Sequence, residues 1–198
     1  MKAKHRLASI SFLIFAVIFL SSCGVQSIPR QYNEVEASWA EVLNQYRRRA
    51  DLVPNVVQTV KSYAEHEKEV LTQVTKLRAQ TFQTNLNIDN LNEESMAKFE
   101  KTQRNMGIHM RRLFGLHERY PDLKSNERYR DLQVQLEGTE NRIAVARKRY
   151  IDTIKEFNNL VEVFPTSITN NLFFKHSKKP QFTVDNPEEL EKAPKLDL

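Results

Sequence analysis

Apolar residues recur at intervals of three and four along most of this chain, from Tyr32 to Phe164. This spacing places them on one face of an α-helix, whereas a strand would need alternation by two, which no stretch shows over a useful length. Only four glycines occur in 198 residues, and the prolines are widely spaced, which favours long helices. The pattern therefore predicts an all-α fold.

The periodic pattern divides into four segments. Two early segments cover residues 32–46 and 53–77, and a weaker third covers residues 96–116. The fourth is the clearest, a heptad seam about 35 residues long, or roughly 50 Å of helix. Its members are Tyr129, Leu132, Leu136, Thr139, Ile143, Ala146, Tyr150, Thr153, Phe157, Leu160 and Phe164.

Pro54 lies at the first joint between segments. With Asp51 as a possible N-cap, Pro54 is well placed in the first turn of a new helix. In mid-helix, Pro54 would instead remove one backbone hydrogen bond and kink the helix. We predict a sharp kink or a tight turn near Ala50; whether Pro54 kinks or breaks the first helix stays open.

The other joints have clearer signals. The asparagine-rich stretch 85–92 predicts a loop before the third helix. Pro121 predicts the end of that helix, and Ser125 or Asn126 can cap the fourth. Pro165 then stops the fourth helix.

Long antiparallel helices joined by short loops give a bundle, so we predict an elongated antiparallel helical bundle of three to four long helices over residues 31–164. Residues 165–198 form a tail, with a short helix expected over 167–174. We expect the tail to dock partly on the bundle, because three of its side chains need apolar cover: Phe173, Phe174 and Phe182. The end of the tail is acidic, contains proline and is predicted to be mobile.

Residues 1–22 have the organisation of a secretory signal peptide. A basic start with Lys2, Lys4 and Arg6 is followed by an uncharged, mainly apolar stretch over residues 7–20. That stretch alone is too short to span a bilayer, which needs about 20 apolar residues.

Leu20-Ser21-Ser22-Cys23 resembles the bacterial lipobox, and Cys23 is the only cysteine in the chain. The resemblance predicts cleavage between Ser22 and Cys23 and a covalent lipid on Cys23. A lipobox product carries several acyl chains, which is enough for stable anchoring. Residues 23–30 are then the lipidated N-terminus and a linker.

The alternative is an uncleaved helix from about Leu7 to Val25. The basic start stays inside under either interpretation, so both place residues 24–198 outside the cytoplasm. Gly24, not Asp, follows the cysteine. By resemblance to enteric lipoproteins, this favours the outer membrane over the inner membrane.

The charge balance gives no support to nucleic-acid binding. The whole chain has a formal net charge of +5, but three basic and no acidic residues precede Cys23, so the mature chain carries only +2. We expect no nucleic-acid partner.

Several blocks of this sequence resemble the LemA family, over about residues 30–198. They are Tyr32-Asn33, Arg48 to Val57, Val60 to Glu67, Tyr120 to Lys124, Glu137 to Arg147, Phe164-Pro165, Leu172-Phe173, Lys179-Pro180 and Ala193-Pro194-Lys195. The resemblance implies a membrane-anchored helical bundle outside the cytoplasm, with no enzyme activity and no cofactor. Many members look anchored by an uncleaved helix, so the lipobox is a departure.

Metal binding and a buried polar cluster are the two candidate chemistries of the bundle interior. A di-iron bundle needs a glutamate three residues before a histidine, and none of the four histidines that follow the signal peptide, at 66, 109, 117 and 176, has one. We therefore expect no metal and no catalytic residue. Polar residues that fall near the interior form a candidate polar cluster: Arg48, Arg49, Asp51, His66, Glu67, Glu137, Glu140 and Arg142. A buried ion-pair network that fixes helix register is the favoured interpretation, and a ligand pocket is the alternative.

The sequence thus favours a non-catalytic binding or scaffold protein tethered at the membrane, with a protein partner or its own copies. Two alternatives remain. One is a ligand- or metal-binding bundle, possibly enzymatic, that uses the polar cluster. The other is a self-assembling structural protein of the envelope.

Overall fold

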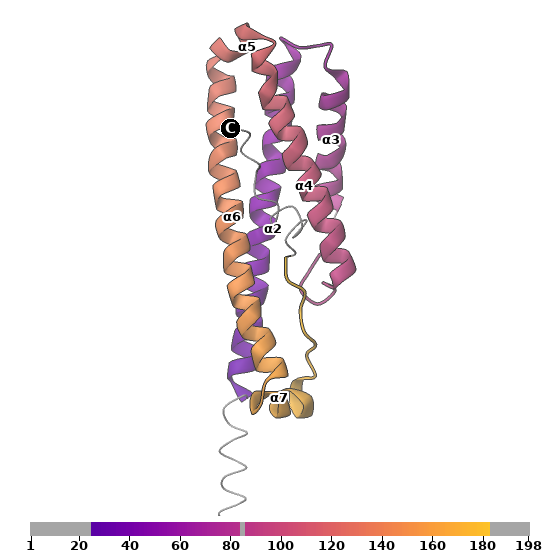
Figure 1. The fold of residues 1–198 in the computed structure, drawn as a ribbon, viewed down its shortest axis with the longest axis vertical. Helices are drawn as coiled ribbons and strands as arrows, with labels where there is room; N and C mark the ends of the chain where they lie inside the picture. Colours follow the sequence, from indigo (N-terminus) through magenta and orange to yellow (C-terminus); the bar gives the residue numbers. More distant parts are fainter. Residues whose placement is uncertain (1–24, 84–85, 183–198) are drawn as a thin grey trace, which may run out of the picture.

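The computed structural model describes residues 25–83 and 86–182, and two long antiparallel helices run the length of the molecule (Figure 1). They are α2 (Ser27–Lys61) and α6 (Glu127–Glu162), and their mutual packing is the most extensive in the molecule. A shorter antiparallel pair, α3 (Lys68–Gln83) and α4 (Glu93–Gly115), packs alongside α2. The predicted elongated all-α bundle is confirmed, and no strand occurs in the described ranges.

Short elements close the two ends of the bundle. At the end where α6 begins, the single turn η1 (Leu116–Glu118) and α5 (Pro121–Ser125) connect α4 to α6. At the other end, α7 (Thr166–Thr169) and the π-turn η2 (Asn170–Phe174) follow α6 (Figure 1). We call the first of these the distal end and the second the proximal end, because α2 begins at the latter.

Asparagine caps start two of the long helices. Asn92 and Ser95 form a reciprocal capping box at α4, which closes the loop predicted before the third helix. Asn126 accepts a hydrogen bond from the Tyr129 amide at 2.9 Å, as expected of an N-cap of α6. The third helix, however, ends at Gly115 rather than at Pro121, and Pro121 instead opens α5.

Of the two predictions near Ala50, a sharp kink or a tight turn, the tight turn is wrong. Helix α2 continues through Pro54, which is exposed, while Ala50, Val53 and Val56 are buried on the opposite side. Burial of a continuous apolar face therefore outweighs the backbone hydrogen bond that proline removes. The chain turns instead at residues 62–67, so the predicted second segment is divided between α2 and α3.

The predicted seam of α6 holds without a break only as far as Tyr150, and of its later positions only Phe157 is buried. From there the buried positions are Ile154, Phe157 and Val161, whereas Leu160 is half-buried and Phe164 is exposed. A straight α-helix has 3.6 residues per turn and drifts against a 3.5-residue repeat. Two successive steps of four residues, from Ala146 to Tyr150 and from Tyr150 to Ile154, keep the apolar side chains on the buried face.

The core consists of two apolar clusters stacked along the bundle. The proximal core contains Ile28, Val35, Trp39, Val42, Tyr46, Ile88, Leu91, Met96, Phe99, Ile143, Ala146, Tyr150, Ile154, Phe157, Val161 and Phe182. The distal core contains Leu52, Val53, Val56, Val60, Ala64, Leu71, Val74, Leu77, Met106, Met110, Leu113, Phe114, Leu116, Leu123, Tyr129, Leu132 and Leu136. Along α2, the proximal core ends at Tyr46 and the distal core begins at Leu52.

The tail docks along the proximal core as far as residue 182. Asn158 on α6 is buried, and its amide group exchanges two hydrogen bonds with the backbone of Lys179, at 3.0 and 2.9 Å. Phe182 packs against Trp39 and Tyr150, and Phe174 packs on the same core. Phe173 was expected to be covered, but its side chain is exposed.

The first boundary of the bundle also differs from its prediction. Residues 27–30 were assigned to a linker, but they form the first turn of α2, and Ile28 is fully buried.

The signal peptide, the sites at Ser22 and Cys23, and the acidic end of the tail lie outside the described residues. Among the helices of the described ranges, none combines the length and apolarity needed to cross a bilayer.

Candidate functional site

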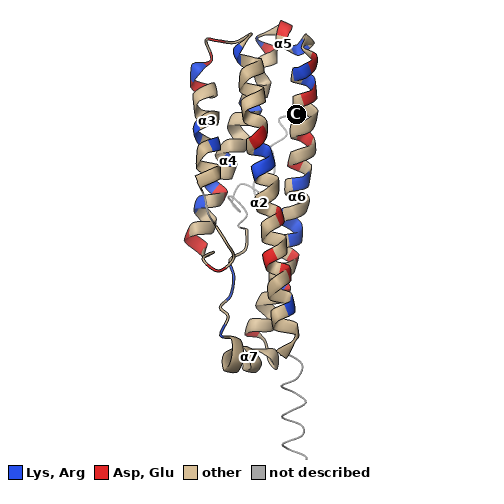
Figure 2. Ribbon diagram, turned by 180° about the vertical axis from the view of Figure 1, so that it is seen from behind, with Lys and Arg blue, Asp and Glu red and all other residues tan. Residues whose placement is uncertain are grey.

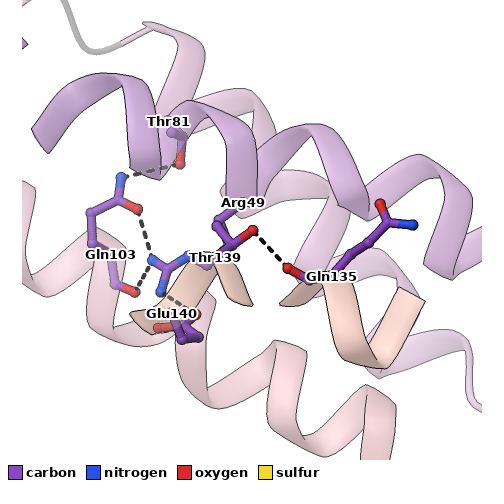
Figure 3. A network of polar contacts seen from close by, with 6 residues as sticks. All are labelled: Arg49, Thr81, Gln103, Gln135, Thr139 and Glu140. Carbon is purple, nitrogen blue, oxygen red and sulfur yellow. Dashed lines mark hydrogen bonds and ion pairs between the residues drawn. The ribbon is translucent and has the colours of Figure 1, made fainter. Parts of the chain in front are cut away.

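A polar layer centred on Arg49 separates the two apolar cores (Figure 3). The Arg49 guanidinium donates to the Glu140 carboxylate on α6 at 3.0 Å. It also donates to both the backbone carbonyl and the side-chain oxygen of Gln103 on α4, at 2.6 and 2.9 Å. The Gln103 amide in turn donates to the Thr81 hydroxyl of α3 at 3.3 Å. One arginine thus links all four long helices.

The local sequence explains why Arg49 points inward. Tyr46, Arg49 and Val53 follow one another at intervals of three and four, so Arg49 lies on the buried face of α2 and is only 3% exposed. Gly107 on α4 leaves room for the guanidinium, because a Cβ there would lie 3.3 Å from an Arg49 terminal nitrogen. A larger residue at position 107 would force Arg49 to move.

The layer is charged, and most of its hydrogen-bonding groups are paired with one another. Burial raises the pKa of Tyr46, whose ring lies 5.0 Å from the Arg49 guanidinium, while the charges of Arg147 and Arg49 oppose that rise. Glu140 keeps 39% of its side chain exposed, so water can solvate the far side of the ion pair. The Arg49 Nε is buried and has no hydrogen-bond partner.

A small pocket of about 140 Å³ opens beside this layer, between α2, α4 and α6. Four arginines and two glutamates are among its lining residues: Arg49, Arg104, Arg111, Arg147, Glu100 and Glu140. The excess of guanidinium groups makes the pocket attractive to a small anion.

Of the eight residues in the predicted polar cluster, the structure brings together only Arg49 and Glu140. Glu67 is half-buried at the distal end, where it pairs with Arg119 at 2.8 Å and accepts a long hydrogen bond of 3.5 Å from Tyr120. The other five are exposed and do not enter the layer: Arg48, Asp51, His66, Glu137 and Arg142. The cluster as predicted is therefore wrong in most of its membership.

Three residues of the layer and its surroundings were not predicted from the sequence: Gln103, Thr81 and Gly107. Gln103 lies four residues after Phe99 and three before Met106, on the buried face of α4, so the helical period could have found it. Thr139 was counted as a seam position, and its hydroxyl bonds the Gln135 carbonyl of its own helix at 2.7 Å (Figure 3).

The layer has no arrangement typical of catalysis. Its buried members are an arginine, a glutamine and two threonines, and these are not paired as a nucleophile and a general base. Within the described ranges, no three His, Cys, Asp or Glu side chains are grouped so that they could hold a metal ion. The geometry is that of a hydrogen-bonded cross-link between helices.

A second polar contact set lies at the proximal end and holds the tail. The His176 ring stacks on Tyr32, with centroids 4.6 Å apart, and the Tyr32 hydroxyl donates to Asp89 in the loop before α4. Burial and the Lys179 charge lower the pKa of His176, although Asp89 opposes this shift. Burial, followed by the hydrogen bond to Asp89, raises the pKa of Tyr32 to about 12. The Lys179 ammonium donates to the Ile88 carbonyl at 2.8 Å.

Comparison with known proteins adds one finding. The family model described as LemA family matches residues 38–198, which include the polar layer and the docked tail. No curated protein matches the chain.

Proposed function

Because this chain belongs to the LemA family, we propose that it is a non-catalytic binding or scaffold protein that is tethered to a membrane of the cell envelope. The observation that carries this proposal is the state of the Arg49 layer. The three Arg49 hydrogen bonds end on groups of the protein itself, on α4 and α6, so this buried charge serves to hold helices together.

The position of the proposed anchor supports a tethering mechanism. Helix α2 begins at Ser27, four residues after Cys23, so a lipid on Cys23 leaves little flexible chain between membrane and bundle. A 35-residue helix is about 50 Å long. The distal end, with η1 and α5, would then be presented well away from the membrane surface, where a protein partner can reach it.

Crosslinking tests the binding function. Cells that express the full chain are treated with a membrane-permeant crosslinker, and the protein is purified and identified by mass spectrometry together with what it carries. We expect one abundant, reproducible protein partner that is absent when Cys23→Ala removes the lipid site. Recovery of the protein alone would contradict the binding function, and recovery of its own copies only would support the self-assembling alternative.

A second candidate function is binding of a small anion, favoured by the buried Arg49 Nε without a partner beside an arginine-rich pocket. Thermal unfolding of the full chain in phosphate, compared with chloride at equal ionic strength, tests it. Arg111→Gln should abolish a phosphate-specific rise in Tm, whereas Arg112→Gln, an exposed neighbour that does not line the pocket, should leave it intact. Equal Tm in both salts would rule the site out.

A further inference from the structure

The proximal end of the bundle exposes a concentrated apolar surface. Its large side chains are between 50% and 69% exposed, and together we call them the end patch: Val163, Phe164, Ile168, Leu172 and Phe173. Residues 163–174 contain no charge, in a chain of which 28% is charged, and α7 is uncharged throughout in Figure 2. Isolated exposed apolar residues are ordinary, but a contiguous group marks an interaction surface.

The end patch is built into the fold, because the polar side of its segment faces inward. Thr169 and Asn170 are each 2% exposed. The Asn170 side chain donates to the His176 carbonyl at 2.9 Å and accepts from the His176 amide at 3.0 Å. Phe164 just before α7, Ile168 on α7 and Leu172 on η2 are left outside. The segment thus buries polar side chains and exposes apolar ones, whereas the surface elements of a bundle ordinarily turn their apolar side chains toward the core.

The location of the end patch indicates what covers it. Helix α2 begins at the same end of the molecule as α7 (Figures 1 and 2), and Ile28 of α2 shares the proximal core with Val161 of α6. The first described residue, Val25, is also partly exposed and follows Cys23 by two positions. An anchor on either Cys23 or the preceding apolar run would therefore hold this end against the bilayer.

We propose that the end patch inserts into the interfacial region of the lipid bilayer as a second membrane contact. Apolar side chains enter the boundary between head groups and acyl chains, and flanking basic residues bind anionic head groups. Lys175 and Lys178, both exposed, follow the patch directly. With two contacts, the bundle would stand in a fixed orientation instead of pivoting on its lipid. This proposal rests on the proposed membrane anchoring.

Tryptophan fluorescence tests the contact. The protein is purified from membranes with its natural N-terminus and reconstituted into phosphatidylethanolamine–phosphatidylglycerol vesicles, with or without lipids brominated near the head-group end of the acyl chains. Phe173→Trp places a reporter in the end patch. Val134→Trp is the control, because Val134 is 67% exposed, like Phe173 at 66%, but lies about 40 Å away along α6. The buried Trp39 contributes the same background to both variants.

We expect brominated lipid to quench the added fluorescence of Phe173→Trp by at least twofold and to leave that of Val134→Trp unchanged. Equal, weak quenching in the two variants would overturn the proposal. A blue-shifted but unquenched Phe173→Trp would also overturn it, because protein and not lipid would then cover the patch. An intact mass of the same sample reports lipid on Cys23 separately, so failure of the anchor and failure of the contact are distinguishable.

Discussion

At the scale of single residues, Arg49 illustrates how much the position on a helix determines. Arg48 and Arg49 are neighbours of the same type, yet one is exposed and the other joins three helices directly. The distinction was available in the sequence, because Arg49 is in phase with Tyr46 and Val53. The partners were not, since Gln103 is 54 residues away and Glu140 is 91 residues away, and only the packing of α4 and α6 brings them together.

Arg49→Met should destabilise the protein by about 2–3 kcal/mol, because removing one member of a buried pair leaves polar groups unsatisfied. This loss is smaller than the roughly 3–5 kcal/mol typical of a fully buried ion pair, because the Glu140 side chain is 39% exposed and can be hydrated. Arg48→Met should stay within about 0.5 kcal/mol of the wild type, as expected of an exposed position. Urea unfolding followed by circular dichroism measures both, and equal stability of the two variants would refute the structural role of the layer.

The stacked His176 ring predicts a pH dependence of tail docking. Its pKa is lowered in the folded protein, so the unfolded chain binds more protons below its ordinary pKa of about 6.5, and stability decreases as the pH falls through that value. The urea concentration at the midpoint of unfolding should be lower at about pH 5.5 than at about pH 7.5. His176→Phe should make this difference smaller, because the ring no longer titrates. His66→Phe, at an exposed site, should not. An unchanged pH dependence in His176→Phe would contradict this explanation.

At the scale of elements, local signals predicted the helix starts better than the helix breaks. Asn126 was recognisable because an N-cap depends on residues within one turn. Pro54 led to the wrong prediction of a turn, because the cost of a proline inside a helix competes with the free energy gained by burying a whole helix face. That burial depends on the packing of α3 and α6. The shift of the α6 seam after Tyr150 has the same origin, since a sequence pattern cannot show how straight the helix is.

Pro54→Ala should therefore stabilise the protein, by about 1 kcal/mol. Alanine restores a backbone donor in the helix interior, and the gain is smaller than the intrinsic preference of about 3 kcal/mol because α2 has already accommodated the ring. Denaturant unfolding measures the change. A loss of stability would mean that a kink at Pro54 is needed for the packing of α2.

Asn158, a buried side chain on α6, supplies two of the hydrogen bonds that hold the tail. Asn158→Ala should cost about 2 kcal/mol, because the Lys179 backbone would lose both partners. It should also speed hydrogen exchange of residues 175–182. Asn159→Ala, at the exposed neighbouring position, should change neither quantity. If both variants behave alike, the tail is held mainly by Phe182.

At the scale of the whole molecule, the pattern of apolar residues was enough to predict an elongated antiparallel bundle. It could not predict the exposed end patch, because an apolar residue such as Phe173 is expected in the core. In the structure Asn170 is buried and Phe173 is exposed. These exposed apolar side chains make the two ends of the bundle chemically different. The proximal end carries the end patch and would meet the proposed anchor, whereas the distal end is the one proposed to face a partner.

The lipid on Cys23 is the central claim, because the tether and the orientation both depend on it. Mass spectrometry of the N-terminal peptide from protein isolated from membranes tests it most directly. We predict that the chain begins at Cys23, with a diacylglyceryl group on Sγ and an acylated amino terminus, and that Cys23→Ala accumulates as the unprocessed precursor. A chain that keeps residues 1–22, or one that begins at an unmodified Cys23, would contradict the account.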